Sequence, residues 1–360
     1  MYCNIFTGSY AEAGAPGIQM LQLNLHTGRL SHLHSCCSVE RPSYLALSPD
    51  NATLYAVSET AVGGSIYALS TEPGRCLSVK NHLATSGGAA CHVAVDPMGQ
   101  YLLVSNYISG ILDAFRLLPS GEIDAHTCAI QFSGSGPVQS RQEQAHAHFA
   151  AFFPEDPNRV IAVDLGSDLL RLLTLDRDTG KPEETGCIRV PAGYGPRHLV
   201  FSRSVKNIVY LVCELSLRVL TVKIEAHSGV VLQNLPCVPD DYVLDAGAGA
   251  IKLSEDGRFL YASTRVYHAQ QGTDCVVCYG IDAETGQLCT PEFTELDGSV
   301  PRDIHPVDDY LLVACQDSDR ITVYPCSPDT GRLQPAVQTY PLYRPSCLIR
   351  CVQNQSLEKE

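Results

Sequence analysis

Seven short turn motifs, each with a glycine just before an apolar residue, recur along the 360-residue chain at intervals of 45 to 59 residues. Glycine suits hairpin turns because, without a Cβ, it adopts positive φ freely. A repeat of this length is typical of β-propellers, in which each copy forms one four-stranded blade. The glycines are Gly28, Gly74, Gly121, Gly180, Gly229, Gly286 and Gly331.

Pairs of apolar strands separated by a turn lie between these glycines, as in segments 41–59, 91–107 and 250–265. They are rich in Val, Ile, Leu and Tyr and are bounded by Pro, Asp, Gly or Asn, which is typical of strands. A third strand, such as 65–70, leads to the next glycine turn, and no long segment has helical periodicity. The sequence therefore predicts an all-β, seven-bladed β-propeller with four-stranded blades.

The two ends of the chain resemble parts of one blade. Residues 4–10, 18–25 and 30–39 resemble second, third and fourth strands, and 344–352 resembles an inner strand. We therefore predict a single domain, 1–360, whose last blade is closed by the N- and C-terminal strands, which removes an unpaired sheet edge. Two packed β-domains are the alternative, and the even spacing disfavours them.

Charge and composition limit the partners. The net charge of −14 disfavours binding to a nucleic-acid backbone. The N-terminus lacks the features of a secretory signal, and no apolar stretch is long enough to span a bilayer. We therefore expect a cytoplasmic protein with no nucleic-acid or membrane partner and with 16 reduced cysteines. The oligomeric state stays open.

Neither a metal nor a cofactor is predicted. Cys275 and Cys278 form one C-x-x-C, but they lie in an apolar run that reads as a strand. Residues three apart on a strand point to opposite faces, so a joint metal or redox site is not expected. The chain also lacks metal-ligand spacings such as H-E-x-x-H.

Polar residues concentrate at two equivalent places in the repeat. In a blade, the start of the first strand and the end of the antiparallel second strand lie at the same face of the ring. The insertions 133–144, 236–247 and 266–273 are connections at that face, where a repeat protein usually binds its ligand. The polar residues are His92, His146, His148, Arg197, His198 and Arg302 at first-strand starts, and Glu59, Asn106, Asp164, Glu214, Arg265 and Gln316 at second-strand ends.

Several motifs occur in the order of a known family: HAH at 146–148, GPRH at 195–198 with Glu-Leu about sixteen residues later, DGRFLYASTR at 256–265 and VPRD at 300–303. The chain resembles the β-propeller lactonases, which include propeller-type 6-phosphogluconolactonases and carboxymuconate cyclases, over essentially its whole length. The resemblance implies a site at the channel mouth. It implies catalytic residues His148, Arg197, Glu214 and Arg265, with His198, Arg302 and Asn106 at neighbouring family positions.

Two departures from the family bear on the substrate. Cys213 stands before Glu214, and Thr264 stands before Arg265, where the family commonly has Asn.

These residue types suit lactone hydrolysis. A histidine of near-neutral pKa or a carboxylate can take a proton from water, and arginine binds anions and a developing oxyanion. We assign His148 as general base or acid, and Glu214 as its orienting or proton-sharing partner. Arg197 and Arg265 are assigned to the substrate anion and the transition state.

Structural roles are the alternative for each residue. His148 could satisfy only backbone groups, and Arg197 and Glu214 could form a structural ion pair, since such pairs also occur outside active sites. His92 and His146 are candidates for substrate binding or for a supporting position behind the site.

Three functions fit this pattern. The first is hydrolysis of an acidic or phosphorylated sugar lactone, with 6-phosphogluconolactone favoured and a place in the pentose phosphate pathway. The second is a lactonising cyclase that uses the same residues in reverse on a dicarboxylate. The third is a non-catalytic interaction platform, which the family motifs and the lack of Trp-Asp repeats disfavour.

Overall fold

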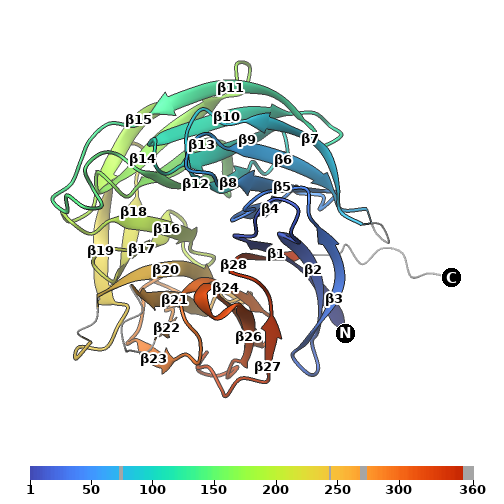
Figure 1. Ribbon diagram of the computed structural model, residues 1–360. Helices are drawn as coiled ribbons and strands as arrows, with labels where there is room; N and C mark the ends of the chain where they lie inside the picture. The colour runs from blue at the N-terminus through green and yellow to red at the C-terminus, as the bar shows by residue number, and fades with distance from the viewer. Residues whose placement is uncertain (73–75, 243–244, 268–273, 352–360) are drawn as a thin grey trace.

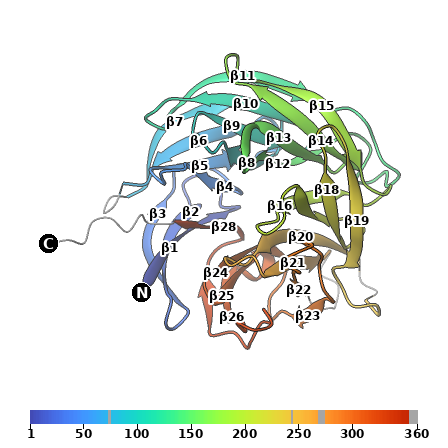
Figure 2. The ribbon, with the colours of Figure 1, turned by 180° about the vertical axis from the view of Figure 1, so that it is seen from behind.

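The computed structural model describes residues 1–72, 76–242, 245–267 and 274–351. Seven four-stranded antiparallel sheets surround a central opening, which confirms the predicted seven-bladed propeller (Figures 1 and 2). No helix in these described ranges is long and apolar enough to cross a bilayer.

Each blade is named here by its inner strand. The strands, from the inside of each blade outward, are β28 (Pro345–Cys351), β1 (Tyr2–Ser9), β2 (Ile18–Asn24), β3 (Arg29–Cys36); β4 (Leu45–Leu47), β5 (Thr53–Ser58), β6 (Ser65–Ser70), β7 (Ser78–Ala84); β8 (Ala90–Val95), β9 (Tyr101–Asn106), β10 (Ile111–Leu117), β11 (Ile123–Gln131); β12 (Ala147–Phe153), β13 (Asp156–Asp164), β14 (Leu169–Asp176), β15 (Lys181–Arg189); β16 (Pro196–Phe201), β17 (Ile208–Cys213), β18 (Arg218–Ile224), β19 (Gly229–Pro236); β20 (Ala246–Leu253), β21 (Phe259–Val266), β22 (Cys275–Gly280), β23 (Glu292–Glu295); and β24 (Pro301–Val307), β25 (Tyr310–Cys315), β26 (Arg320–Pro325), β27 (Gln338–Pro341).

The burial of each strand follows its place in the blade. Second strands such as β17 (IVYLVC) are buried at every residue, because adjacent blades cover both of their faces. Outer strands such as β19 alternate between exposed and half-buried residues, as expected at the rim. The core consists of apolar clusters between neighbouring blades. One of them joins Phe153 and Leu172 of the β12 blade to Leu199 and Leu220 of the β16 blade.

The ring closes as predicted. β28 pairs with β1 in an antiparallel register that aligns Thr7 with Leu348, so both ends of the chain belong to one sheet. Strand β1 would otherwise be an exposed edge with unpaired N–H and C=O groups.

The glycine turns connect third and fourth strands. Five of the seven glycines have φ between 67° and 83°, as predicted. Gly229 differs, because the turn is completed by Glu225 N–H donating to Ser228 O, and Gly229 opens β19 without positive φ. A Cβ there would lie 2.6 Å from Lys223 O, so close packing is the reason for this glycine. Gly74 lies outside the described residues.

The C-x-x-C residues behave as predicted, because Cys275 and Cys278 of β22 point to opposite faces. The Cys275 thiol donates to Cys237 O, whereas the Cys278 thiol donates to Thr330 O in the next blade.

Candidate active site at the channel mouth

A β-bulge at the start of the inner strand sets the direction of the site residues. In five blades the pairing with the second strand skips one residue, and a bulge of this kind re-aims its side chain. All five skipped residues line one cavity in the channel. They are Cys91, His148, Arg197, Arg302 and Ser346.

The remaining two blades use the equivalent position differently. Ser43 precedes β4 and lines the same cavity. In the β20 blade the position is Gly249, whose carbonyl accepts a hydrogen bond from Arg197 Nη1 at 2.9 Å. A Cβ on Gly249 would lie 2.6 Å from Ser263 Oγ, so this blade contributes backbone to the site.

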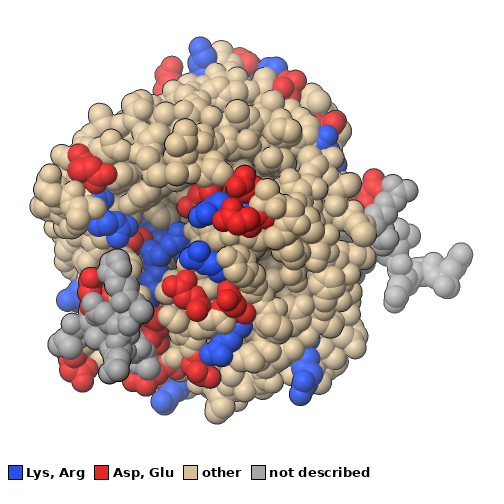
Figure 3. All heavy atoms as spheres, in the orientation of Figure 1, with Lys and Arg blue, Asp and Glu red and all other residues tan. Residues whose placement is uncertain are grey.

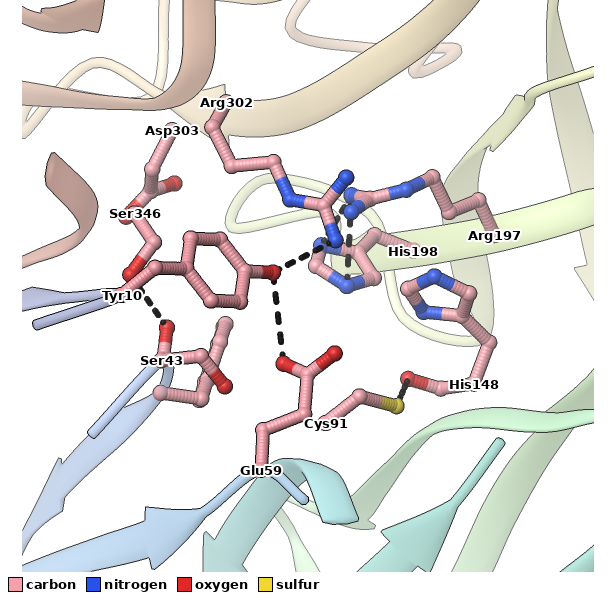
Figure 4. Close-up of a pocket in the computed structure, with 11 residues that line it drawn as sticks. Tyr10, Ser43, Glu59, Cys91, His148, Arg197, His198, Arg302, Asp303 and Ser346 are labelled. Atoms are coloured by element: carbon pink, nitrogen blue, oxygen red, sulfur yellow. Dashed lines mark hydrogen bonds between the residues drawn. The ribbon is translucent and has the colours of Figure 1, made fainter. Parts of the chain in front are cut away.

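The cavity is small, about 10 Å³, which is room for about one water molecule. Figure 4 shows Tyr10 on one side of it and His148 on the opposite side, with Glu59 between them. The cavity therefore fits a reactant water, and any larger ligand has to extend toward the mouth.

Glu214 is the most heavily bonded group of the site. It is 2% exposed, and its Oε2 accepts from Arg197 Nε at 3.0 Å and from Arg265 Nη2 at 2.8 Å. Its Oε1 accepts from Arg141 Nη2 at 2.6 Å and from Tyr267 OH at 3.0 Å. Four donors from different segments thus converge on one carboxylate.

The electrostatics follow from this arrangement. Burial alone would raise the pKa of Glu214, but Arg265, Arg197 and Arg141 hold it well below its ordinary value. Burial, together with repulsion from Arg265 and Arg302, lowers the pKa of Arg197 to about 10. At neutral pH Glu214 is therefore anionic and Arg197 cationic, and the three arginines around Glu214 leave a surplus of positive charge.

His148 is kept neutral. Its ring packs edge-on against His198, with ring centroids 5.1 Å apart, and against Tyr107 at 5.5 Å. Burial and the nearby Arg197 hold the pKa of His148 well below its ordinary value. The buried Nδ1 has no hydrogen-bond partner among the described residues. His148 can therefore accept a proton.

Of the predicted catalytic residues, Arg197 and Arg265 pair with Glu214, and His148 lines the same cavity as Arg197. His198 adjoins it, because both of its ring nitrogens lie 3.4 Å from Arg197 Nη1. Burial, with Arg197 next in effect, holds the pKa of His198 well below its ordinary value.

Arg302 reaches the cavity from the β24 blade. Its Nη2 donates to Tyr10 OH at 2.8 Å, and Tyr10 OH donates to Glu59 Oε2 at 3.2 Å. Burial opposes the charge on Arg302, yet the nearby Tyr10 and Glu59 oxygens raise its pKa. No carboxylate of the described chain lies within ion-pair distance of Arg302.

The other predicted residues lie behind the cavity. His92 is sandwiched between Tyr44 and Phe149, with ring centroids 4.3 and 4.2 Å away. His146 stacks on Tyr107 at 4.4 Å and bonds the Tyr107 carbonyl through Nδ1 at 2.9 Å. Both therefore support aromatic neighbours rather than line the cavity.

Asn106 faces the interior of its own blade. Its Nδ2 donates to Asp113 Oδ2 at 2.9 Å and to Ile111 O at 3.1 Å. The structure thus does not bring Asn106 together with His148 and Glu214.

Arg141, Tyr10 and Tyr267 were missed as site residues by the sequence analysis. Arg141 lies in insertion 133–144 and Tyr267 in insertion 266–273, two of the insertions predicted to lie at the binding face. Asp168 links this region to the site by accepting from Gln142 Nε2 and from Gly195 N–H. The repeat pattern carries no signal for these loop residues.

The two departures from the family face away from the channel. Cys213 is fully buried between the β12 and β16 blades. Thr264 is also fully buried, and its Oγ1 lies 2.9 Å from Cys275 Sγ within the β20 blade. Neither side chain changes the composition of the cavity.

The central hollow is lined with basic side chains, and acidic side chains lie beside it on the same face (Figure 3). Figure 3 shows Lys and Arg side chains gathered in the central hollow, although the net charge of the chain is −14. Within the described residues, no group of three or more His, Cys, Asp or Glu side chains is placed to hold a metal ion. The arrangement suits an anionic small molecule and proton transfer through His148.

Comparison with known proteins gives a consistent result. The family described as "Lactonase, 7-bladed beta-propeller" matches residues 4–350. A 6-phosphogluconolactonase of Bacillus subtilis is 29% identical, with 95% of this chain and 97% of that protein covered. Another from Formosa agariphila is 30% identical, with 92% and 94% covered. The solved structure of a periplasmic gluconolactonase of Pseudomonas aeruginosa has a TM-score of 0.89 and 26% identity, with 98% and 99% covered.

Proposed function

Because the chain belongs to the seven-bladed β-propeller lactonase family, we propose that it hydrolyses a small anionic sugar lactone, with 6-phosphogluconolactone as the favoured substrate. The observation that carries the proposal is the surplus of arginines around Glu214 beside the neutral, unpaired Nδ1 of His148. The names of the relatives, 6-phosphogluconolactonase and gluconolactonase, support the same substrate class.

In the proposed reaction, His148 takes a proton from a water molecule in the cavity. The water oxygen then forms a bond to the lactone carbonyl carbon, and the carbonyl oxygen becomes an oxyanion. Arg197 lines the same cavity and is cationic, so it stabilises this oxyanion. The ring C–O bond then breaks, and the leaving oxygen takes the proton from the imidazolium of His148. The products are the ring-opened hydroxy acid and the unchanged enzyme.

Glu214 has a different role in this scheme from proton transfer. Both of its oxygens accept two hydrogen bonds each, and its pKa is held well below its ordinary value. Protein donors thus occupy its acceptor sites, whereas Nδ1 of His148 has no partner among the described residues. Glu214 therefore holds Arg197, Arg265 and Arg141 in position.

The proposed setting is the cytoplasm, in the pentose phosphate pathway. All 16 cysteines are free thiols in the structure, as a reducing compartment would keep them. Fractionation of cells that express the chain tests this proposal, and recovery in an extracytoplasmic fraction would contradict it.

The deciding experiment compares 6-phosphogluconolactone, unphosphorylated gluconolactone and a carboxymuconate, each against its spontaneous rate. We expect fastest turnover of the phosphorylated lactone, with most activity lost in Arg197→Ala and in His148→Ala. Conversion of the carboxymuconate alone would favour the lactonising cyclase. Lack of turnover of all three would favour a binding platform, and full activity in both folded variants would remove the site.

A further inference from the structure

Three arginines surround the ring of Tyr10 at the channel mouth. The guanidinium carbons of Arg41, Arg302 and Arg344 lie 5.5, 5.7 and 5.7 Å from the ring centroid. We call these three residues the Tyr10 arginine cluster. Tyr10 itself lies across the cavity from His148 (Figure 4). The lactonase mechanism leaves Arg41 and Arg344 without a role.

The two outer arginines belong to a duplicated motif. Residues 41–43 and 344–346 both read Arg-Pro-Ser; the first copy precedes β4, and the second leads into β28, which starts at Pro345. Backbone bonds attach both copies to the end of β1: Arg41 N–H donates to Ala11 O, and Tyr10 N–H donates to Arg344 O. The repeat thus places one arginine from each copy of the motif beside Tyr10.

Both arginines adopt a backbone conformation that disfavours side chains with a Cβ. Arg41 has φ 45° and Arg344 has φ 37°. The same conformation occurs at the equivalent positions Ala89, Gly195 and Val300, so it does not depend on an arginine. Among these five positions, only the two beside Tyr10 carry a long cationic side chain.

Unpaired buried donors accompany the cluster. Ser43, the third residue of the first copy, is 4% exposed and lines the cavity, and its Oγ has no hydrogen-bond partner among the described residues. The buried Nε of Arg41 is also unpaired in the described structure. Buried donors normally have partners, so these two point to an acceptor that the chain itself does not supply.

The carboxylates that do contact the cluster are exchangeable. Arg41 Nη1 lies 3.2 Å from Glu12, and Arg344 Nη2 lies 3.6 Å from Asp317, in exposed pairs. Exposed ion pairs contribute little free energy, and a ligand can replace them. Arg302 contacts Tyr10, which is neutral.

We infer that the Tyr10 arginine cluster, with Ser43, is the subsite for a phosphate monoester: the distal phosphate of the lactone substrate. Arginine donors in planar forks match phosphate oxygens, and the hydroxyl of Ser43 adds a donor at the cavity wall. The substrate then lies at the mouth above the cavity, with its phosphate on the Tyr10 side and its carbonyl carbon over the water site between His148 and Arg197. This inference rests on the proposed function for the identity of the substrate.

The test compares kinetics of Arg41→Ala, Arg344→Ala and the double variant on phosphorylated and unphosphorylated gluconolactone. Each single variant should raise KM for the phosphorylated lactone roughly 10-fold or more, which is the effect of losing a charged hydrogen bond. Both kcat and the KM for the unphosphorylated lactone should stay near wild type. Equal losses on the two lactones, or no loss on either, would overturn the inference.

Arg258→Ala is the matched control. Arg258 also packs over an aromatic ring, 5.2 Å from the centroid of Phe259, and pairs with Asp256, but it lies in the turn between β20 and β21 at the opposite face. It should leave both KM values unchanged. If the alanine variants fold poorly, Arg41→Lys and Arg344→Lys replace them in the test. These variants keep the positive charge and should retain part of the affinity for the phosphorylated lactone.

Titration with inorganic phosphate separates the two proposals. If the wild-type protein hydrolyses neither lactone, the proposed function fails, yet phosphate binding still tests the subsite. Binding that weakens in the Arg41/Arg344 double variant but not in Arg258→Ala supports the subsite. Binding that is the same in all three proteins contradicts it.

Discussion

At the scale of single residues, His148 depends on its surroundings for its protonation state. Four aromatic and cationic neighbours bury the ring, and burial costs the charged form more than the neutral form. The same imidazole in water would be partly protonated near pH 6.5. The fold therefore extends the range of pH over which His148 can act as a base.

The pH dependence of catalysis follows from this shift. The neutral form of His148 is the active one, and its pKa lies well below 6.5, so kcat/KM should stay level on acidification through pH 6.5 and fall only in more acidic solution. His148→Asn should lower kcat about 10²- to 10⁴-fold. A fall in kcat/KM centred at or above pH 6.5 would contradict the assignment. The control is His26→Asn, a substitution at an exposed histidine, which should leave kcat unchanged.

Glu214 is expected to matter for folding as well as for activity. Glu214→Gln removes the negative charge that pairs with three arginines, two of which are buried. Because buried charges would then lack a counter-charge, the free energy of unfolding should fall by about 3 kcal/mol. Denaturant unfolding measures this. Glu184→Gln, which alters a partly exposed pair with Arg171, should cost less than about 1 kcal/mol. Equal costs for the two variants would show that the Glu214 cluster is not stabilising.

At the scale of elements, the inner-strand bulges and the insertion 133–144 position different residues of the site. The bulges direct side chains from five blades into the cavity. The insertion brings Arg141 over the mouth, and it is held by one fully buried residue, Gln142, whose Nε2 donates to Leu165 O and to Asp168 Oδ1 at 2.9 Å each.

Gln142→Ala should therefore release the insertion while leaving the blades intact. We expect KM for the lactone to rise several-fold, because Arg141 is no longer held in position. The free energy of unfolding should fall by about 1–3 kcal/mol, because the Asp168 carboxylate and the Leu165 carbonyl lose the hydrogen bonds from Gln142. Steady-state kinetics and denaturant unfolding measure the two effects. Gln144→Ala is the control, because Gln144 is an exposed neighbour whose Nε2 donates to Ile108 O. An unchanged KM in Gln142→Ala would separate the loop from substrate binding.

At the scale of the whole molecule, the ring brings residues from all seven of its blades to one opening. The same ring keeps four histidines neutral: the buried His92, His148 and His198, and the half-buried His305, whose pKa is lowered to about 3. On unfolding, each regains an ordinary pKa near 6.5 and binds a proton in mildly acidic solution.

Stability should therefore decrease as the pH falls below about 6.5, before most carboxylates titrate. In this range the unfolded chain binds more protons than the folded one, and each neutral histidine contributes up to about 1.4 kcal/mol per pH unit. Unfolding free energies measured from pH 7.5 to 5 test this. His305→Asn should make the slope shallower by about one proton, whereas exposed His26→Asn should not. A flat profile would contradict the neutral state of these residues.

The sequence by itself determined the number of blades, the closure through β28 and β1, and the clustering of His148, Arg197, Glu214 and Arg265. Those properties depend on the residues of the turns and on a regular repeat, both of which can be read directly from the sequence. Only the tertiary structure decided which polar residues face the cavity. Asn106 and Arg265 both occupy second-strand ends, yet Asn106 turns into its blade toward Asp113 and Arg265 binds Glu214. The difference arises because the partner of a side chain sets its direction. Arg265 pairs with Glu214, more than fifty residues earlier in the chain, and Asn106 pairs with Asp113 on the next strand. Neither pairing leaves a local pattern in the sequence, and the same holds for the one-residue bulges of the inner strands.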